Sequence, residues 1–182
     1  MLDHPFSRPP SALAVGIGIL LATACVFSAA QTDAELEPCA DKLALQQAVQ
    51  RLNELRQQAD APCAIHHAAE QPLAWEPRLA NSAFEQARDL AQRDLLSHVD
   101  SQQRGLGARL RNAGYVASGA GENLAAGQTD FNDTLQAWIA SPSHCVNLMK
   151  PEYRDVGLAC VQRRGSHYER FWVAHLGTSV RQ

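Results

Sequence analysis

The side chains best suited to act together at one chemical site are two histidines and a glutamate. His98 closes a predicted helix, Glu122 lies in a short segment flanked by glycines, and His144 follows the break that Pro142 makes after another predicted helix. All three lie at the ends of elements or in short loops, where side chains from distant parts of a chain can converge. Two imidazoles and a carboxylate suit a divalent metal such as zinc, with water in the fourth position.

The same residue types support two other interpretations. By type, Ser141, His144 and Glu122 offer a nucleophile, a base and an orienting acid for hydrolysis, although no G-x-S-x-G pattern accompanies them. Alternatively, His98, Glu122 and His144 form a hydrogen-bonded polar cluster that joins helices to a sheet, because a buried carboxylate between histidines is satisfied in that way. His175 lies in a predicted strand, where we expect a core or edge histidine rather than a fourth ligand.

Periodic apolar residues predict the elements that position these side chains. Four helices are predicted, over 41–58, 77–96, 105–114 and 131–139. Pro77 suits the first turn of the second helix, where its missing N–H group removes no bond. Alternating apolar residues over 155–162 and 167–176 predict a β-hairpin. We expect an extended segment over 121–125, preceded by a flexible link.

The N-terminal sequence predicts export. Residues 11–30 form an apolar run that ends in small residues, which is typical of a signal peptide over 1–30; a short polar linker over 31–40 follows. One alternative is an uncleaved membrane anchor, since the run approaches the roughly 20 residues needed to span a bilayer. Another is a lipid anchor at Cys25. We expect a secreted or periplasmic protein with no transmembrane segment in the mature chain.

The overall composition is that of an ordinary globular domain. Apolar residues make up 46 % of the chain and charged residues 19 %, which excludes a largely disordered protein. The 16 basic and 19 acidic side chains give a net charge of −3. Since there is no basic excess, we expect no nucleic-acid partner.

The cysteines support an oxidising compartment. Beyond Cys25 the chain has Cys39, Cys63, Cys145 and Cys160, and an even number in an exported chain predicts two disulfides with three alternative pairings. Pairing by neighbours gives Cys39–Cys63 and Cys145–Cys160. Each bridge closes a loop of roughly 15–25 residues and is worth about 3 kcal/mol by loop entropy.

Eight short motifs follow one another in a fixed order. They are L-N-E-L-R at 52–56, P-L-A-W-E-P-R-L-A at 72–80, S-H at 97–98, R-L-R-N-A-G-Y at 109–115, G-E-N-L-A at 121–125, W-I-A-S-P-S-H-C-V-N-L-M at 138–149, D-V-G-L at 155–158 and W-V-A-H-L-G at 172–177. Together they resemble the CAP superfamily of cysteine-rich secretory, antigen 5 and pathogenesis-related 1 proteins, most of all its bacterial secreted branch. The resemblance implies an α+β fold over 41–179, a three-layer α-β-α sandwich with a central, mostly antiparallel sheet.

The resemblance also implies a cleft with two histidines and two acids. His98 matches the first histidine, Glu122 the first acid and His144 the second histidine. The second acid is expected three positions after Trp138, where this chain has Ser141. A serine would be a poor zinc ligand, but it could bond a metal-bound water or orient His144.

Three functions are compatible with this cleft. The first is a binding module of the cell envelope or exterior, which takes a small ligand, a lipid, a protein partner or one zinc ion. The second is a metal-dependent or serine/histidine hydrolase at the same cleft, and the third is a structural envelope protein. Because the second acid is replaced by Ser141, binding is favoured over catalysis.

Overall fold

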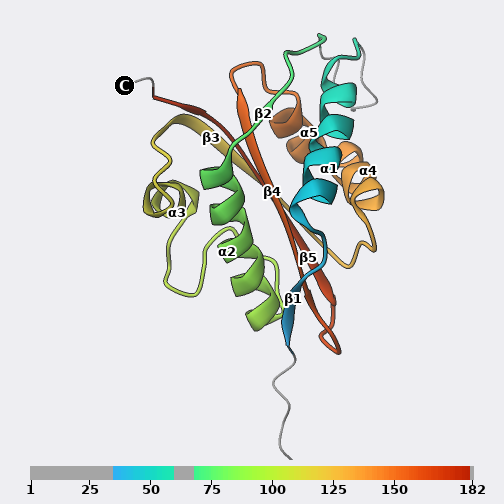
Figure 1. Ribbon diagram of the computed structural model, residues 1–182, viewed down its shortest axis with the longest axis vertical. Helices are drawn as coiled ribbons and strands as arrows, with labels where there is room; N and C mark the ends of the chain where they lie inside the picture. Colours follow the sequence, from blue (N-terminus) through green and yellow to red (C-terminus); the bar gives the residue numbers. More distant parts are fainter. Residues whose placement is uncertain (1–34, 60–67, 181–182) are drawn as a thin grey trace, which may run out of the picture. The chain divides into compact units, whose positions relative to one another are not determined.

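A five-stranded sheet lies between two layers of helices in the computed structural model (Figure 1). The structure describes residues 35–59 and 68–180, all of which belong to one unit, Thr32–Gln182. The predicted signal peptide, Cys25 and Cys63 lie outside the described residues. Within the described ranges, no helix combines the length and the apolar character needed to cross a membrane.

The elements follow one another as helices and strands of moderate length. In chain order they are β1 (Leu36–Pro38), α1 (Lys42–Arg56), β2 (Ala74–Trp75), α2 (Pro77–Arg93), α3 (Leu106–Asn112), β3 (Ala117–Ala126), α4 (Phe131–Ala140), α5 (Pro142–Leu148), β4 (Asp155–Arg163) and β5 (Arg170–Ser179). The sheet has the strand order β1-β4-β5-β3, and β2 pairs with β4 as well. Among the strand pairs of the described residues, β2–β4 alone is parallel, which confirms a mostly antiparallel sheet.

Alternation along the β4–β5 hairpin divides the core between the two faces of the sheet. Leu158 and Ala174, which lie opposite each other, pack in one cluster with α1, α4 and α5. Their neighbours Ala159 and Val173 pack in a second cluster with α2. Successive strand side chains point to opposite faces, so this division confirms the predicted α-β-α sandwich.

The closest approach between layers is that of α2 to β4. Alanines line the buried face of α2, with Ala83, Ala87 and Ala91 fully buried. A Cβ atom added to Gly157 of β4 would lie 2.1 Å from the backbone nitrogen of Ala80. The helix backbone therefore packs directly against the strand, and only glycine fits at this position.

The four predicted helices are confirmed as α1 to α4, and Asp130 is the N-cap of α4. Three segments differ from expectation. Leu36–Pro38, inside the predicted linker, forms β1; the predicted flexible link belongs to β3 from Ala117 onward, where β5 pairs with it. The helical structure is interrupted for one residue only, Ser141, because Pro142 begins α5. His144 therefore lies on a helix.

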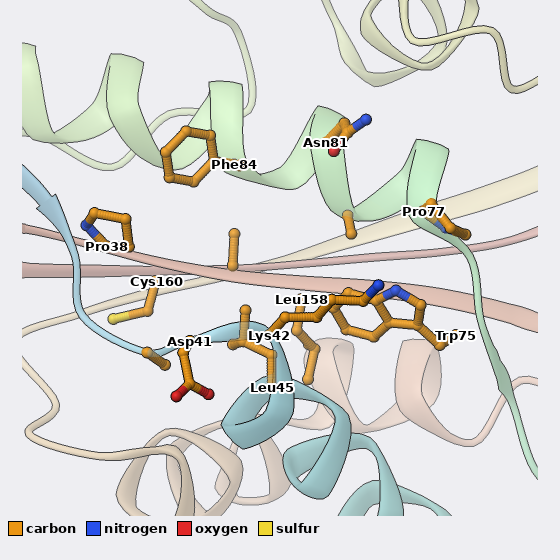
Figure 2. Close-up of a pocket in the computed structure, with 13 residues that line it drawn as sticks. Pro38, Asp41, Lys42, Leu45, Trp75, Pro77, Asn81, Phe84, Leu158 and Cys160 are labelled. Carbon is orange, nitrogen blue, oxygen red and sulfur yellow. The ribbon is translucent and has the colours of Figure 1, made fainter.

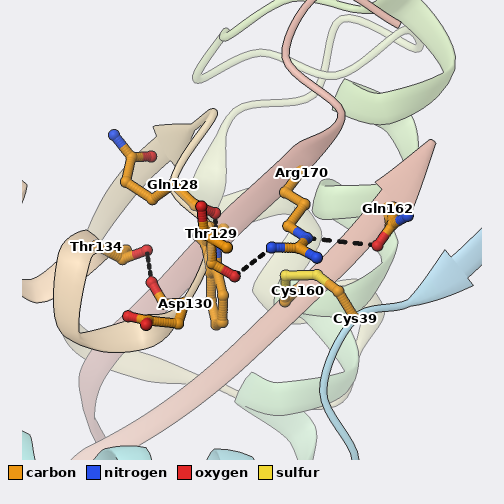
Figure 3. The surroundings of a disulfide bond; sticks show 9 residues. Cys39, Gln128, Thr129, Asp130, Thr134, Cys160, Gln162 and Arg170 are labelled. Atoms are coloured by element: carbon orange, nitrogen blue, oxygen red, sulfur yellow. Dashed lines mark hydrogen bonds between the residues drawn. A yellow bond between two sulfur atoms is a disulfide. The ribbon is translucent and has the colours of Figure 1, made fainter. Parts of the chain in front are cut away.

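The cysteine pairing differs from the neighbour prediction. Cys39 and Cys160 form a disulfide with a Cα–Cα distance of 5.2 Å (Figure 3), so the predicted pairs Cys39–Cys63 and Cys145–Cys160 are wrong. The physical cause is strand pairing: β1 runs antiparallel to the end of β4, which brings Cys39 opposite Cys160. The Cys39 amide also donates a 3.0 Å hydrogen bond to the Cys160 carbonyl. A pairing between residues so distant in sequence has no local signal.

Side chains near this bridge join the hairpin to the start of α4. The Arg170 guanidinium donates to Gln162 Oε1 at 3.3 Å and to the Thr129 carbonyl (Figure 3). Trp172 Nε1 donates to the Gln128 carbonyl at 3.0 Å. The chain that enters α4 is therefore held to β5 by two side chains of that strand, Arg170 and Trp172.

Gly157→Ala tests the contact between α2 and β4. We expect the free energy of unfolding to fall by about 1–3 kcal/mol or more, because the new methyl group must push the helix backbone away. Gly107→Ala on α3 is the matched control, since its added Cβ would meet only the end of the flexible Arg111 side chain, at 3.5 Å, and it should not lower stability, because alanine favours a helix over glycine. Urea denaturation measures both; equal stabilities would contradict the close packing.

Peptide mapping without reduction tests the bridges. We expect a Cys39–Cys160 peptide pair from the exported protein. Recovery of Cys39 linked to Cys145 would contradict this assignment.

Candidate functional site

Glu122 is the buried centre of the candidate site. It lies on β3, opposite His175 of β5 in the strand register, and its side chain is 3 % exposed. Leu124, two residues further along β3, packs in the core cluster of α2. Since residues i and i+2 of a strand share a face, the Glu122 carboxylate lies on the α2 and α3 side of the sheet.

Three basic side chains from three different segments bind this carboxylate. His98 Nδ1, from the loop after α2, lies 2.7 Å from Oε1. His175 Nε2, from β5, lies 2.8 Å from Oε2, and the Arg109 guanidinium of α3 binds the same oxygen. Both carboxylate oxygens are thus occupied by groups of the protein itself.

The ionisation states follow from these contacts. Burial alone would raise the pKa of Glu122, but the hydrogen bonds from His175 and His98 and the charge of Arg109 outweigh it and hold the pKa at about 2. Burial lowers the pKa of His175, against the opposing effect of Glu122. Glu122 is therefore an anion at neutral pH, and a neutral His175 donates its Nε2 hydrogen to it.

Arg109 also positions the loop that carries His98. Its guanidinium donates to the backbone carbonyls of His98 and Arg104, each at 2.8 Å. The His98 imidazole itself is 64 % exposed, and its hydrogen bond to Glu122 raises its pKa. His98 is therefore held by the buried carboxylate at Nδ1 while the rest of its ring faces solvent.

His144 comes from the opposite layer of the sandwich. Asn123, the neighbour of Glu122 on β3, donates to the His144 carbonyl at 3.0 Å, and Asn147 donates to Asn123 Oδ1 at 3.1 Å. Burial lowers the pKa of His144, and the charge of His98 lowers it further, which places the two imidazoles within electrostatic reach. The His144 ring makes no hydrogen bond to any described residue.

Ser141 lies at the junction between α4 and α5. Its hydroxyl is 3.3 Å from the hydroxyl of Ser143. In the part of the chain that the structure describes, no hydrogen bond joins Ser141 to His144 or His144 to the Glu122 carboxylate. The nucleophile, base and acid of a hydrolase are therefore not connected in this structure.

A zinc ion fits this arrangement poorly. Across residues 35–59 and 68–180, no three His, Cys, Asp or Glu side chains are grouped so that they could hold a metal ion. Glu122 Oε2 already accepts from Arg109 and His175, and Oε1 accepts from His98, so at most one lone pair of this carboxylate is left for a metal. The structure therefore brings His98 and Glu122 into contact, places His144 nearby, and leaves Ser141 apart.

Sequence reasoning missed Arg109 and underestimated His175. Arg109 lies beside the buried Leu110 on α3, and its side chain is 4 % exposed. An arginine on the apolar face of a short helix was the available signal. His175 is fully buried as expected, but its contact with Glu122 depends on the register between β3 and β5, which the sequence does not reveal.

Comparison with known proteins agrees with this geometry. The sequence model of the cysteine-rich secretory protein family, CAP, matches residues 49–176. The chain belongs to the CAP family. A curated relative, the uncharacterized protein YkwD of Bacillus subtilis (strain 168), is 25 % identical over 91 residues. That match covers 50 % of this chain and 35 % of YkwD, so the CAP chain spans about a third of that relative.

Solved structures share the CAP fold of this chain. An extracellular protein with an SCP domain from Bacillus anthracis str. Ames is 24 % identical with a TM-score of 0.62, covering 75 % of this chain and 40 % of its own. An outer surface protein of Borrelia burgdorferi is 19 % identical with a TM-score of 0.66, covering 80 % of this chain and 100 % of its own. At these identities the likeness establishes the fold alone.

Glu122→Gln tests whether the buried carboxylate holds the site together. The variant keeps the shape but leaves Arg109 buried without an anion, so we expect the free energy of unfolding at pH 7 to fall by about 3–5 kcal/mol. Glu85→Gln is the matched control, because Glu85 is 65 % exposed in its pair with Arg88 and such pairs contribute roughly 0–1 kcal/mol. Equal losses in urea denaturation would contradict this assignment.

The effect should depend on pH in a defined direction. The pKa of Glu122 in the folded protein, about 2, lies below its ordinary value of 4.5. A depressed pKa stabilises the folded state above the ordinary value, and this contribution is lost as the pH falls through the folded value. The stability difference between the wild type and Glu122→Gln should therefore shrink from about pH 5 to about pH 2.

Proposed function

We propose that this CAP chain is an extracellular binding module that takes an amphipathic, lipid-like ligand beside His98 and His144. The observation that carries the proposal is the state of Glu122, whose two oxygens are bound by His98, Arg109 and His175. A carboxylate held in this way is a structural anion, not a general base. The groups left to meet a ligand are the two imidazoles.

The surface around the imidazoles supports an amphipathic ligand. Leu96 and Val99 flank His98 in its loop and are 43 % and 40 % exposed. Contiguous exposed apolar patches rimmed by polar residues are typical of interaction sites. The imidazoles would meet the polar part of such a ligand, and the aliphatic groups its apolar part.

An extracellular location is supported by two relatives. The similar structure from Bacillus anthracis is described as extracellular and the one from Borrelia burgdorferi as an outer surface protein. An exported chain agrees with the predicted signal peptide and with the Cys39–Cys160 bridge, since disulfides persist in oxidising compartments.

Solvent extraction of the purified protein, followed by mass spectrometry, tests this proposal. We expect a near-stoichiometric lipid, and about tenfold less of it with the double variant Leu96→Ser/Val99→Ser, since each aliphatic side chain loses its buried contact with the ligand. Leu43→Ser on α1 is the matched control, because Leu43 is 65 % exposed and outside the proposed surface. Absence of lipid, together with fluorophosphonate labelling of Ser141, would favour the hydrolase instead.

Zinc binding by His98, Glu122 and His144 stays a prediction. Only one lone pair of the Glu122 carboxylate, on Oε1, is left for the ion, so affinity should be weak. Calorimetric titration of the metal-free protein with zinc measures it, with His98→Ala and His144→Ala as variants that should abolish it.

A further inference from the structure

One edge of the sheet is interrupted between two short strands. On the side of β4 away from β5, β2 pairs with Asp155 and Val156 and β1 pairs with the segment from Val161 to Arg163. The stretch between them has no strand partner on this edge. At about 3.3 Å per residue, the gap leaves room for roughly three residues of an extended chain.

Main-chain groups of β4 point into this gap. The Val156 carbonyl accepts from the Glu76 amide at 2.9 Å, and the Cys160 carbonyl accepts from the Cys39 amide at 3.0 Å, both on the outer edge. In an antiparallel strand the N–H and C=O of every second residue point to the same side. The N–H and C=O of Leu158 therefore point outward too, and no described residue bonds them there.

Apolar side chains from both helical layers enclose the gap as a slot of about 370 Å³ (Figure 2). Phe84 of α2 lies on one wall and belongs to the α2 side of the core. Leu45 of α1 and Trp75 of β2 lie on the other wall and belong to the α1 side. The Lys42 side chain extends along the slot towards Trp75 (Figure 2), and Leu158 itself is 1 % exposed.

We propose that this slot binds an extended peptide segment of a partner protein, which adds a short strand to β4 between β1 and β2. Such a segment supplies both an acceptor and a donor for the main chain of Leu158, which an acyl chain lacks and a helix already uses internally. Successive side chains of a strand point to opposite faces. They would meet Phe84 on one wall and Leu45 with Trp75 on the other.

Lys42 acts as the displaceable cover of the slot. Lysine side chains on edge strands commonly prevent unwanted pairing, and here the lysine lies at the start of α1, next to the N-cap Asp41. An incoming peptide must move this side chain out of the slot. The site is thus selective for segments that gain enough from main-chain pairing and apolar contact.

Nuclear magnetic resonance titration with a designed probe tests the proposal. The probe is an acetylated, amidated tetrapeptide of alternating valine and threonine, whose length is close to that of the gap. We expect saturable shifts of the Leu158 and Ala159 amide resonances. A second peptide, N-methylated at the two central residues, keeps the side chains but loses two donors, and should bind about tenfold more weakly.

Two variants, each with a matched control, sharpen the result. Lys42→Ala should tighten binding by roughly 2- to 10-fold, because no long side chain has to be reordered, whereas Arg51→Ala on the exposed side of α1 should not. Ala80→Phe fills the slot and should abolish the shifts, and Ala137→Phe on α4 is its control. Circular dichroism confirms that each variant folds.

Four outcomes overturn the proposal. Equal binding of the N-methylated peptide would show an apolar cavity without strand addition. Binding of laurate at the same resonances, with no peptide binding, would show an acyl site. Shifts that depend on protein concentration alone would show pairing between two copies of this chain. Absence of any shift with Lys42→Ala at millimolar peptide would exclude a peptide site, without bearing on the function proposed for His98 and His144.

Discussion

The buried anion of Glu122 is the constraint on which the site depends. Removing a carboxylate from water is costly unless charged or polar partners replace the lost hydration. Here the partners come from a loop, from α3 and from β5, so one side chain joins three segments that are separate in sequence. Arg109 adds to this by bonding the carbonyl of His98. The position of His98 therefore depends on Glu122 directly and again through Arg109.

The alternation of β3 determines where the second histidine lies. Glu122 points to the layer of α2 and α3, and its neighbour Asn123 reaches the carbonyl of His144 on α5. The two imidazoles thus come from different layers, and the charge of His98 still reaches His144. A site assembled in this way presents two imidazoles to solvent above a carboxylate that is already neutralised. This geometry suits recognition better than proton transfer through Glu122.

Local signals in the sequence predicted the local structure. The helices and the β4–β5 hairpin have apolar periodicity within one segment, and the short motifs identified His98, Glu122 and His144. Features that depend on strand register were not accessible in the same way. The Cys39–Cys160 bridge requires β1, which is three residues long, and the contact of His175 with Glu122 requires the pairing of β3 with β5. Arg109 was missed because its signal, an arginine on the apolar face of a short helix, does not tell which anion it binds.

The outward main-chain groups of β3 and of β4 are hydrogen-bonded in different ways, and this difference distinguishes the two proposed sites. Along β3, side chains bond the outward carbonyls: Asn147 donates to that of Glu122 at 3.4 Å, and Trp138 to that of Leu124 at 3.0 Å. Along β4, short strands and loop amides serve this purpose on both sides of Leu158 but not at Leu158 itself. At β3 the outward main-chain groups are already bonded by side chains, so a ligand there would meet side chains such as the two imidazoles. At β4 the outward main-chain groups are bonded by other backbone segments except at Leu158, so this position favours the backbone of a bound peptide.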